Sequence, residues 1–215
     1  IRAVIPIRDF ADDKYLVMAT SHGVIKKTAL SMYDNVRRSG VIAIDLSEGD
    51  DLVSVKLTSG DQELIIVTAQ GQSIRFRENE VRPLGRVARG VKAISLSKGD
   101  AVVGMDVVRQ GCDLLVVTAN GFGKRTPLAE YRLQSRGGRG IKTLKVTPKT
   151  GPAADVKVLT SDDELMLISA EGIIIRMNAA DIPQQGRSTQ GVRVMKLEPG
   201  DKVVSLAQVV GKNGG

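Results

Sequence analysis

The sequence is poor in the residue types on which most enzymes and disulfide-stabilised proteins depend. Its 215 residues include one cysteine, one histidine and no tryptophan. A single cysteine, Cys112, excludes an internal disulfide and fits a reducing cytoplasm. A single histidine, His22, leaves little for metal binding or histidine-based catalysis. We therefore expect no catalytic residue, no metal site and no cofactor within this chain.

Two further shortages narrow the choice of partner. Aromatic residues make up only 3% of the chain, whereas proteins that bind RNA or single strands usually stack bases on aromatic side chains. No apolar run approaches the roughly 18 residues that a membrane span needs, and no signal-peptide pattern opens the chain. We expect a cytoplasmic protein without a membrane partner.

What the chain has in excess is positive charge, with a formal net charge of +7 at pH 7. Such a balance favours a polyanionic partner, either a nucleic acid or an anionic membrane surface. Because aromatic platforms are scarce, the phosphate backbone of a duplex is the better candidate.

The positive charge is repeated. A unit of about fifty residues occurs four times, and a period of this length is typical of propellers and other arrays. The copies align on a glycine that follows an apolar run, at Gly23, Gly71, Gly121 and Gly172. A basic residue stands four positions later in every copy, at Lys27, Arg75, Arg125 and Arg176. A second glycine, with arginines before it, follows at Gly40, Gly90, Gly140 and Gly191.

Each copy reads as four short strands. An apolar run and a glycine turn precede a second strand, a basic loop, a third strand, a Gly-Asp turn in three of the copies, and a fourth strand. The pattern predicts an all-β, propeller-like β-pinwheel of four-stranded blades, with about four complete blades plus part of a preceding one. We expect a single domain over residues 1–215. Its predicted parts are repeats at 15–62, 63–112, 113–163 and 164–210, the end of a preceding blade at 1–14, and a loose tail at 211–215.

The opening Ile1–Ile7 matches the fourth strand of the unit, so we expect the chain to be a fragment of a longer array. Tyr33, Tyr131 and Phe76 each fall at an apolar slot of the repeat and are predicted to pack in the core. Acidic pairs such as Asp50–Asp51 are interpreted as solvated turns.

Residues Gln134–Gly140 carry a family resemblance. They resemble the heptapeptide Gln-Arg-Arg-Gly-Gly-Arg/Lys-Gly, which is the box motif of the DNA gyrase A subunit, with Ser135 in place of an arginine. The similarity extends over nearly the whole chain, for example at Tyr15–Thr20 and Gly121–Leu128. The chain therefore resembles the C-terminal DNA-wrapping domain of gyrase A, and we interpret its motif as a later echo of the principal box.

The resemblance implies a fold, a function and an assembly. The family's fold is a six-bladed β-pinwheel whose basic rim wraps duplex DNA beside the strand-passing core of a type IIA topoisomerase. The implied partners are double-stranded DNA, the gyrase B subunit, and the remainder of the gyrase A subunit, in an A2B2 assembly associated with the nucleoid. The holoenzyme is expected to use ATP and Mg, with its catalytic residues in other domains.

Phosphate contact is predicted for the basic residues of the repeat, since arginine and lysine are the usual phosphate ligands. The predicted DNA-binding residues are Lys26, Lys27, Arg37, Arg38, Arg75, Arg86, Arg89, Lys124, Arg125, Arg136, Arg139, Arg176 and Arg187. The box-like motif comprises Gln134, Ser135, Arg136, Gly137, Gly138, Arg139 and Gly140.

Three alternatives stay open at this point. The equivalent C-terminal domain of topoisomerase IV has a similar pattern with weaker boxes. A protein-binding propeller would present an apolar or acidic patch instead of a basic one. A propeller enzyme would need acids or histidines that converge near the axis, and the sequence supplies no such set.

Overall fold

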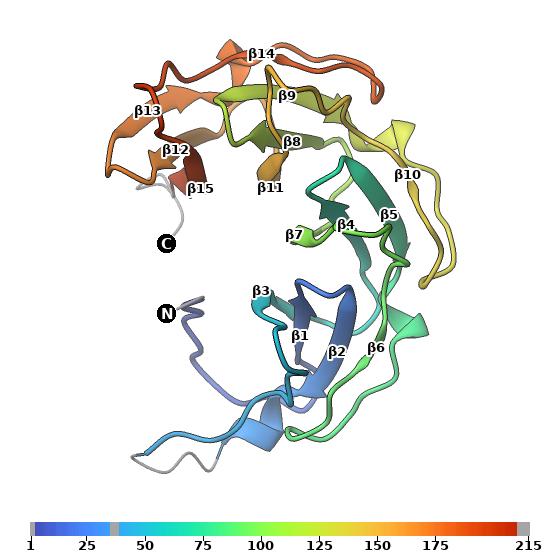
Figure 1. Cartoon of the computed structure of the whole chain (residues 1–215). Coiled ribbons are helices and arrows are strands. Elements are labelled where there is room, and N and C mark those ends of the chain that lie inside the picture. The colour runs from blue at the N-terminus through green and yellow to red at the C-terminus, as the bar shows by residue number, and fades with distance from the viewer. Residues whose placement is uncertain (1–2, 35–38, 210–215) are drawn as a thin grey trace.

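The computed structural model describes residues 3–34 and 39–209 and is all-β, with four small sheets set around a common axis (Figure 1). This confirms the predicted propeller-like architecture. Arg37 and Arg38, two of the predicted DNA-binding residues, lie outside the described residues, as does the predicted loose tail 211–215.

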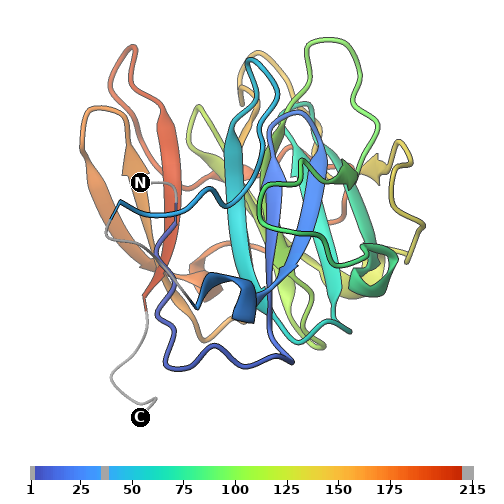
Figure 2. The same cartoon turned by 90° about the horizontal axis from the view of Figure 1, so that it is seen from below.

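The strands of each sheet run between the two flat faces of the ring (Figure 2). Blade 1 comprises β3 (Leu52–Thr58), β1 (Tyr15–Thr20), β2 (Val24–Ala29) and β6 (Val91–Lys92). Blade 2 comprises β7 (Val102–Val107), β4 (Glu63–Thr68), β5 (Gln72–Arg77) and β10 (Ile141–Lys142). Blade 3 comprises β11 (Ala153–Leu159), β8 (Asp113–Thr118), β9 (Phe122–Pro127) and β14 (Val192–Arg193). Blade 4 comprises β15 (Val203–Val209), β12 (Glu164–Ser169) and β13 (Ile174–Asn178).

A short 3-10 helix follows the second strand of every repeat. These four turns are η1 (Leu30–Tyr33), η2 (Glu78–Glu80), η3 (Leu128–Glu130) and η4 (Ala179–Asp181). Strands β3, β7, β11 and β15 contact one another in sequence around the axis, whereas β6, β10 and β14 form the outer edge (Figure 1). The strand order therefore separates an inner wall from an outer rim.

Neighbouring repeats exchange their outer strand. The strand after the second glycine of one repeat pairs with the middle hairpin of the preceding blade, as in Val24↔Lys92 and Ile25↔Val91. Equivalent pairs join β10 to β5 and β14 to β9. The sequence predicted these strands but could not show that each belongs to the neighbour's sheet.

Glycine is required on both sides of this joint. Gly90 has a φ of +112°, and a Cβ there would lie 2.5 Å from the carbonyl oxygen of Ile25. On the accepting side, a Cβ at Gly23 would lie 2.9 Å from the carbonyl oxygen of Ile94. The backbones approach too closely for any larger residue, which explains why both glycines recur in the repeat.

The joint, meaning the pairing of an exchanged outer strand with the neighbouring hairpin, is missing at the two ends of the open arc among the described residues. Gly40 and Gly172 keep positive φ values of +81° and +84°, but a Cβ at either would meet no atom of the described residues within 4 Å. Segment 39–46 accordingly forms no strand, and blade 4 has three strands among the described residues. The prediction of a third strand at Val41–Leu46 is therefore wrong, because no strand of residues 3–34 and 39–209 pairs with it.

The prediction of a strand at the start of the chain is also wrong for the described part. Residues 3–13 form no ladder; instead Ile5 and Ile7 pack against a cluster that includes Leu16 and Tyr33. The other hydrophobic clusters each combine two adjoining blades. Tyr33, Tyr131 and Phe76 are all buried, as predicted.

The Gly-Asp turns are built by hydrogen bonds to a carboxylate. Asp50 accepts from the hydroxyl of Ser21 at 2.8 Å and from the backbone N–H groups of His22 and Asp51 at 2.9 Å. Burial opposes ionisation of Asp50, but these hydrogen bonds outweigh it and lower its pKa. Asp100 and Asp201 hold the same turn in later repeats, which agrees with a structural role for these acids.

The joint predicts a difference between two glycines at the same repeat position. Gly172→Ala should lower the free energy of unfolding only through the strain of a positive φ in alanine, roughly 1–2 kcal/mol. Gly121→Ala should cost about 1–3 kcal/mol more, since its Cβ would collide with the carbonyl of Met195. Urea unfolding of both variants measures the difference, and equal losses of stability would contradict the close approach.

Candidate nucleic-acid interface

Four of the predicted DNA-binding side chains are not on the surface. Lys26 and Lys124 are fully buried, and Lys27 and Arg125 are 4% and 7% exposed. Their donors are used inside the protein, so phosphate contact is ruled out for them in this structure. The correction has a physical reason: a cation buried between blades is stable only where carbonyls or acids replace its water.

Lys26 and Lys124 each hold a loop of the following repeat, and Lys26 also holds segment 39–46 of its own repeat. The ammonium of Lys26 donates to the carbonyls of Ala43, at 2.5 Å, and Arg86. The ammonium of Lys124 donates to the carbonyls of Gly186 and Arg187, at 2.6 and 2.7 Å. The pKa of each lysine falls to about 8, mainly because of burial; Arg86 adds to the fall for Lys26, whereas for Lys124 the fall is opposed by Glu130 and aided by Arg187.

The basic residue four positions after the first glycine is a joint between repeats. Arg75 pairs with Glu63 at 2.6 Å and donates to the carbonyls of Leu128 in η3 and of Tyr131 directly after it. Arg125 pairs with Asp113 at 2.5 Å and donates to the carbonyl of Ile182 after η4. Each guanidinium thus ties its own hairpin to the 3-10 turn of the next repeat.

Lys27 makes the same joint in blade 1 with different partners. Its ammonium donates to the carbonyl of Glu78 at 3.2 Å and lies 3.9 Å from the Glu78 carboxylate and 5.1 Å from the centre of the Tyr15 ring. Burial lowers its pKa, and Glu78 opposes that shift. Arg176 of blade 4 is the exposed member of the set and pairs with Glu164.

The loops before the second glycine carry the arginines that remain available. Arg86, Arg136 and Arg187 are half-buried. Each donates through Nη1 to a carbonyl of the preceding repeat, at Ile42 (3.3 Å), Lys92 (2.9 Å) and Lys142 (3.1 Å). Arg136 also donates through Nε to the carbonyl of Glu80 at 2.9 Å. The planar guanidinium has five N–H donors, so the remaining ones are free to meet a phosphate.

Arg89 and Arg139 stand next to the second glycine and are exposed. Arg89 is paired with Asp45 at 3.0 Å, and both partners are more than half exposed. Such a surface pair contributes little to stability and is readily exchanged for a phosphate.

The box-like motif forms a tight loop on blade 2. Gly137 donates to the carbonyl of Ala93 at 2.6 Å, and the side-chain hydroxyl of Ser95 donates to the carbonyl of Gly137 at 2.7 Å. A Cβ at Gly140 would collide with the carbonyl of Ser73, while Ser135 is exposed and Gln134 donates through its backbone to Arg75. The glycines serve the joint and keep the loop backbone close to the neighbouring blade.

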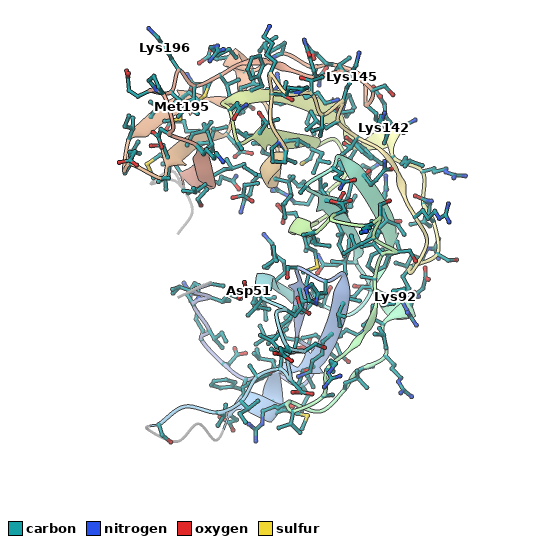
Figure 3. All side chains as sticks on the ribbon, in the orientation of Figure 1. Asp51, Lys92, Lys142, Lys145, Met195 and Lys196 are labelled. Atoms are coloured by element: carbon teal, nitrogen blue, oxygen red, sulfur yellow. The ribbon has the colours of Figure 1, made fainter. Side chains whose placement is uncertain are left out.

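Sequence reasoning missed a second set of rim cations. Two positions after the second glycine, the outer strands carry Lys92, Lys142 and Arg193, all exposed. Three positions further, Lys145 and Lys196 are also exposed. Figure 3 places Lys92, Lys142, Lys145 and Lys196 on the outer side of the arc, with Asp51 near the axis. The repeat itself held this signal, since the position is basic in three of four copies.

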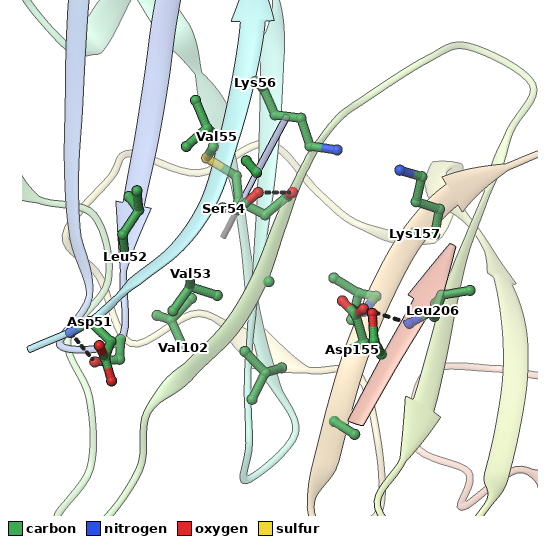
Figure 4. A pocket seen from close by; sticks show the side chains of 18 of the residues that line it. Asp51, Leu52, Val53, Ser54, Val55, Lys56, Val102, Asp155, Lys157 and Leu206 are labelled. Atoms are coloured by element: carbon green, nitrogen blue, oxygen red, sulfur yellow. Dashed lines mark hydrogen bonds between the residues drawn. The ribbon is translucent and has the colours of Figure 1, made fainter. Parts of the chain in front are cut away.

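The inner wall has a different character. Strands β3, β7, β11 and β15 surround a cavity of about 640 Å³ (Figure 4). Its charged lining residues are Asp51, Lys56, Asp155 and Lys157. Lys56 pairs with Asp106 at 2.8 Å. Burial raises the pKa of Asp155 to about 6, although the N–H groups of Val156 and Leu206 donate to it. Its lining residues include two acids, Asp51 and Asp155, and no histidine.

Two kinds of feature are absent from the described residues. Within 3–34 and 39–209, no group of histidine, cysteine, aspartate and glutamate side chains has the arrangement of a metal site. Within the same residues, no helix is long and apolar enough to cross a bilayer.

Comparisons with known proteins agree with this geometry. The family model described as the DNA gyrase C-terminal domain, a β-propeller, matches residues 14–59, 62–109, 113–151 and 163–209. The DNA gyrase A subunit of Clostridium acetobutylicum is 51% identical, covering 97% of this chain and 25% of that protein. The corresponding protein of Halalkalibacterium halodurans is 57% identical with the same coverage. The chain spans about a quarter of the length of these curated relatives.

Two solved structures are similar in fold. A structure of a DNA gyrase A C-terminal domain has a TM-score of 0.88 and 29% identity, covering 95% of this chain and 68% of that one. A crystal structure of the C-terminal domain of DNA topoisomerase IV has a TM-score of 0.89 and 31% identity, covering 95% of this chain and 64% of that one.

Removal of a buried cation at the joint and removal of an exposed cation of the rim should have different effects on the stability of the fold. Arg125→Ala leaves the Asp113 carboxylate buried without its cation and should destabilise the fold by about 3–5 kcal/mol. Arg139→Ala removes an exposed side chain and should change stability by less than about 0.5 kcal/mol. Chemical unfolding compares them; a mild effect of Arg125→Ala would contradict its role in the joint.

Proposed function

The chain belongs to the family of DNA gyrase C-terminal β-propeller domains, and on this basis we propose that it is a non-catalytic module that binds duplex DNA and bends it around its rim. One observation carries the proposal: exposed lysines in or just after successive outer strands, at Lys92, Lys142, Lys145 and Lys196, lie along the outer side of one arc (Figure 3). A duplex is the polyanion long enough to meet them all.

The proposed contacts are to the phosphate backbone. They comprise Arg86, Arg89, Arg136, Arg139 and Arg187 of the loops together with Lys92, Lys142, Lys145, Arg193 and Lys196 of the outer strands. Phosphate contacts position a duplex without reading its sequence. Weak sequence preference follows, with easily bent DNA favoured because wrapping costs elastic energy.

We further propose that the module acts within a gyrase. The wrap presents a nearby segment of the same DNA to the strand-passing core, so that ATP-driven passage introduces negative supercoils. ATP and Mg then bind in other domains of an assembly formed with gyrase B and with the rest of gyrase A, in the cytoplasm and on the nucleoid. The module supplies geometry, and the chemistry takes place elsewhere.

The equivalent domain of a topoisomerase IV is the second candidate. The similarity to a solved C-terminal domain of DNA topoisomerase IV, with a TM-score of 0.89, supports this second candidate. Both curated relatives described above are gyrase subunits. The two candidates share the basic rim, so DNA binding alone does not distinguish them. They differ in the supercoiling that a holoenzyme containing this module produces.

Affinity for DNA should depend steeply on salt and on duplex length. If about eight phosphates are neutralised, a plot of log K against log salt should have a slope of roughly −7. Affinity should rise from duplexes of about 20 to about 80 base pairs, since only the longer ones can follow the arc. Fluorescence anisotropy measures both, and a slope near zero would refute an electrostatic rim.

Single rim residues should each account for part of the slope. Lys92→Ala and Lys142→Ala should weaken binding to all sequences alike and reduce the salt slope by about 1 each. Lys202→Ala is the matched control, because Lys202 is exposed but occupies the repeat position of Asp51, which lies near the axis. A larger loss for Lys202→Ala than for the rim variants would place the DNA on another face.

A further inference from the structure

Two buried lysines touch the proposed DNA-binding loops from beneath. Lys26 of β2 lies under loop 82–90, and Lys124 of β9 lies under loop 184–191. Both are fully buried, so neither can reach a ligand outside. We propose that they are positioning residues, which fix these two loops so that their arginines face the DNA; this inference rests on the function proposed above.

The contact is made at the arginines themselves. Lys26 donates to the backbone carbonyl of Arg86, and Lys124 donates to that of Arg187 at 2.7 Å. In both loops the same arginine uses one guanidinium nitrogen for a carbonyl of the preceding repeat. The arginine is thus held at its backbone and at one edge of its side chain, which leaves few directions for the remaining donors.

The other two blades show that the lysine is not needed for the fold. The same position of the repeat is Ile74 in blade 2 and Ile175 in blade 4. Over Ile74, the loop of repeat three is fastened instead by the side-chain hydroxyl of Ser95, which donates to the carbonyl of Gly137. The backbone N–H of Ser95 also donates to the carbonyl of Gly138, but an equivalent backbone bond is present in the two loops that lie over a lysine. Isoleucine therefore fits this slot, and a lysine occurs where the loop lacks the pair of glycines.

Holding an ammonium in this slot is costly. Its surroundings are Arg86 for Lys26, and Glu130 and Arg187 for Lys124; burial is the main reason that both pKa values fall to about 8. A group whose native pKa lies below its unfolded value destabilises the fold at pH 7, and this penalty disappears as the pH rises from about 8 toward the unfolded value. If this side chain only filled the core, isoleucine would be the more stable residue. The presence of lysine therefore indicates a role in holding the loop.

The test uses the full chain with Lys26→Ile, Lys124→Ile and the double substitution. Hydrogen exchange without DNA is measured at loop amides such as Gln185, which donates to the carbonyl of Arg125. Lys124→Ile should speed exchange in loop 184–191 about tenfold, with no change in loop 132–140 or in β8. Unchanged exchange in loop 184–191 overturns the proposal.

The second readout is DNA affinity. The double variant should bind about tenfold more weakly with an unchanged salt slope, because each loop must first be ordered and no phosphate contact is lost. Lys202→Ile, which removes the same charge from a surface away from the rim, should bind as the wild type does. Faster exchange with unchanged affinity also overturns the proposal.

The two readouts separate this inference from the function on which it rests. If the unmodified chain shows no salt-dependent DNA binding, the proposed function fails, while hydrogen exchange still decides whether the lysines fix the loops. If the double variant binds weakly and its salt slope falls by about 2, the lysines act as ordinary phosphate ligands and the proposal is wrong.

Discussion

The structure depends on one constraint, the close approach of two backbones where consecutive repeats exchange a strand. A glycine on each side lets the outer strand of one repeat pair with the hairpin of the one before it, as at Gly90 against Ile25. Because blades 1 to 3 are each completed by a strand of the next repeat, the basic loop that precedes the exchanged strand is anchored to two blades at once. The spacing of the rim charges is therefore set by the joint, and the loop has little freedom to change it.

The sequence was sufficient to predict the period, the overall architecture and most of the strands. Apolar runs, glycine turns and the Gly-Asp turns each have a local physical cause that one repeat contains in full. The sequence could not predict which sheet the outer strand joins. A two-residue pairing such as that of Val91–Lys92 with β2 depends on a partner about seventy residues away in the chain. The first segment, 39–46, looks the same in the sequence and lacks only that partner.

The candidate site was predicted in part, and the errors share one cause. The recurrence of a charged residue in the repeat does not show whether its partner is another part of the protein or a ligand. Arg125 recurs because it closes the joint with Asp113, and a signal for this was present: an acid stands twelve positions before the arginine in three repeats, at Glu63, Asp113 and Glu164. In the first repeat that position is Tyr15, whose ring lies under Lys27 instead. Charges with a recurring counter-charge at fixed spacing belong to the fold, whereas Lys92 and Lys142 have none and lie on the rim.

This division of the cations follows from desolvation. A cation inside the protein is stable only when acids and carbonyls replace its water, and those same partners keep it from a phosphate. A cation on the rim keeps its water and its counterions, and releasing those counterions is what drives binding to DNA. The chain therefore needs both kinds at neighbouring positions of one repeat. The inner set fixes where each blade stands, and the outer set can then act along a curved line, so that stiffness of the ring opposes the few kcal/mol by which a bent duplex tends to straighten.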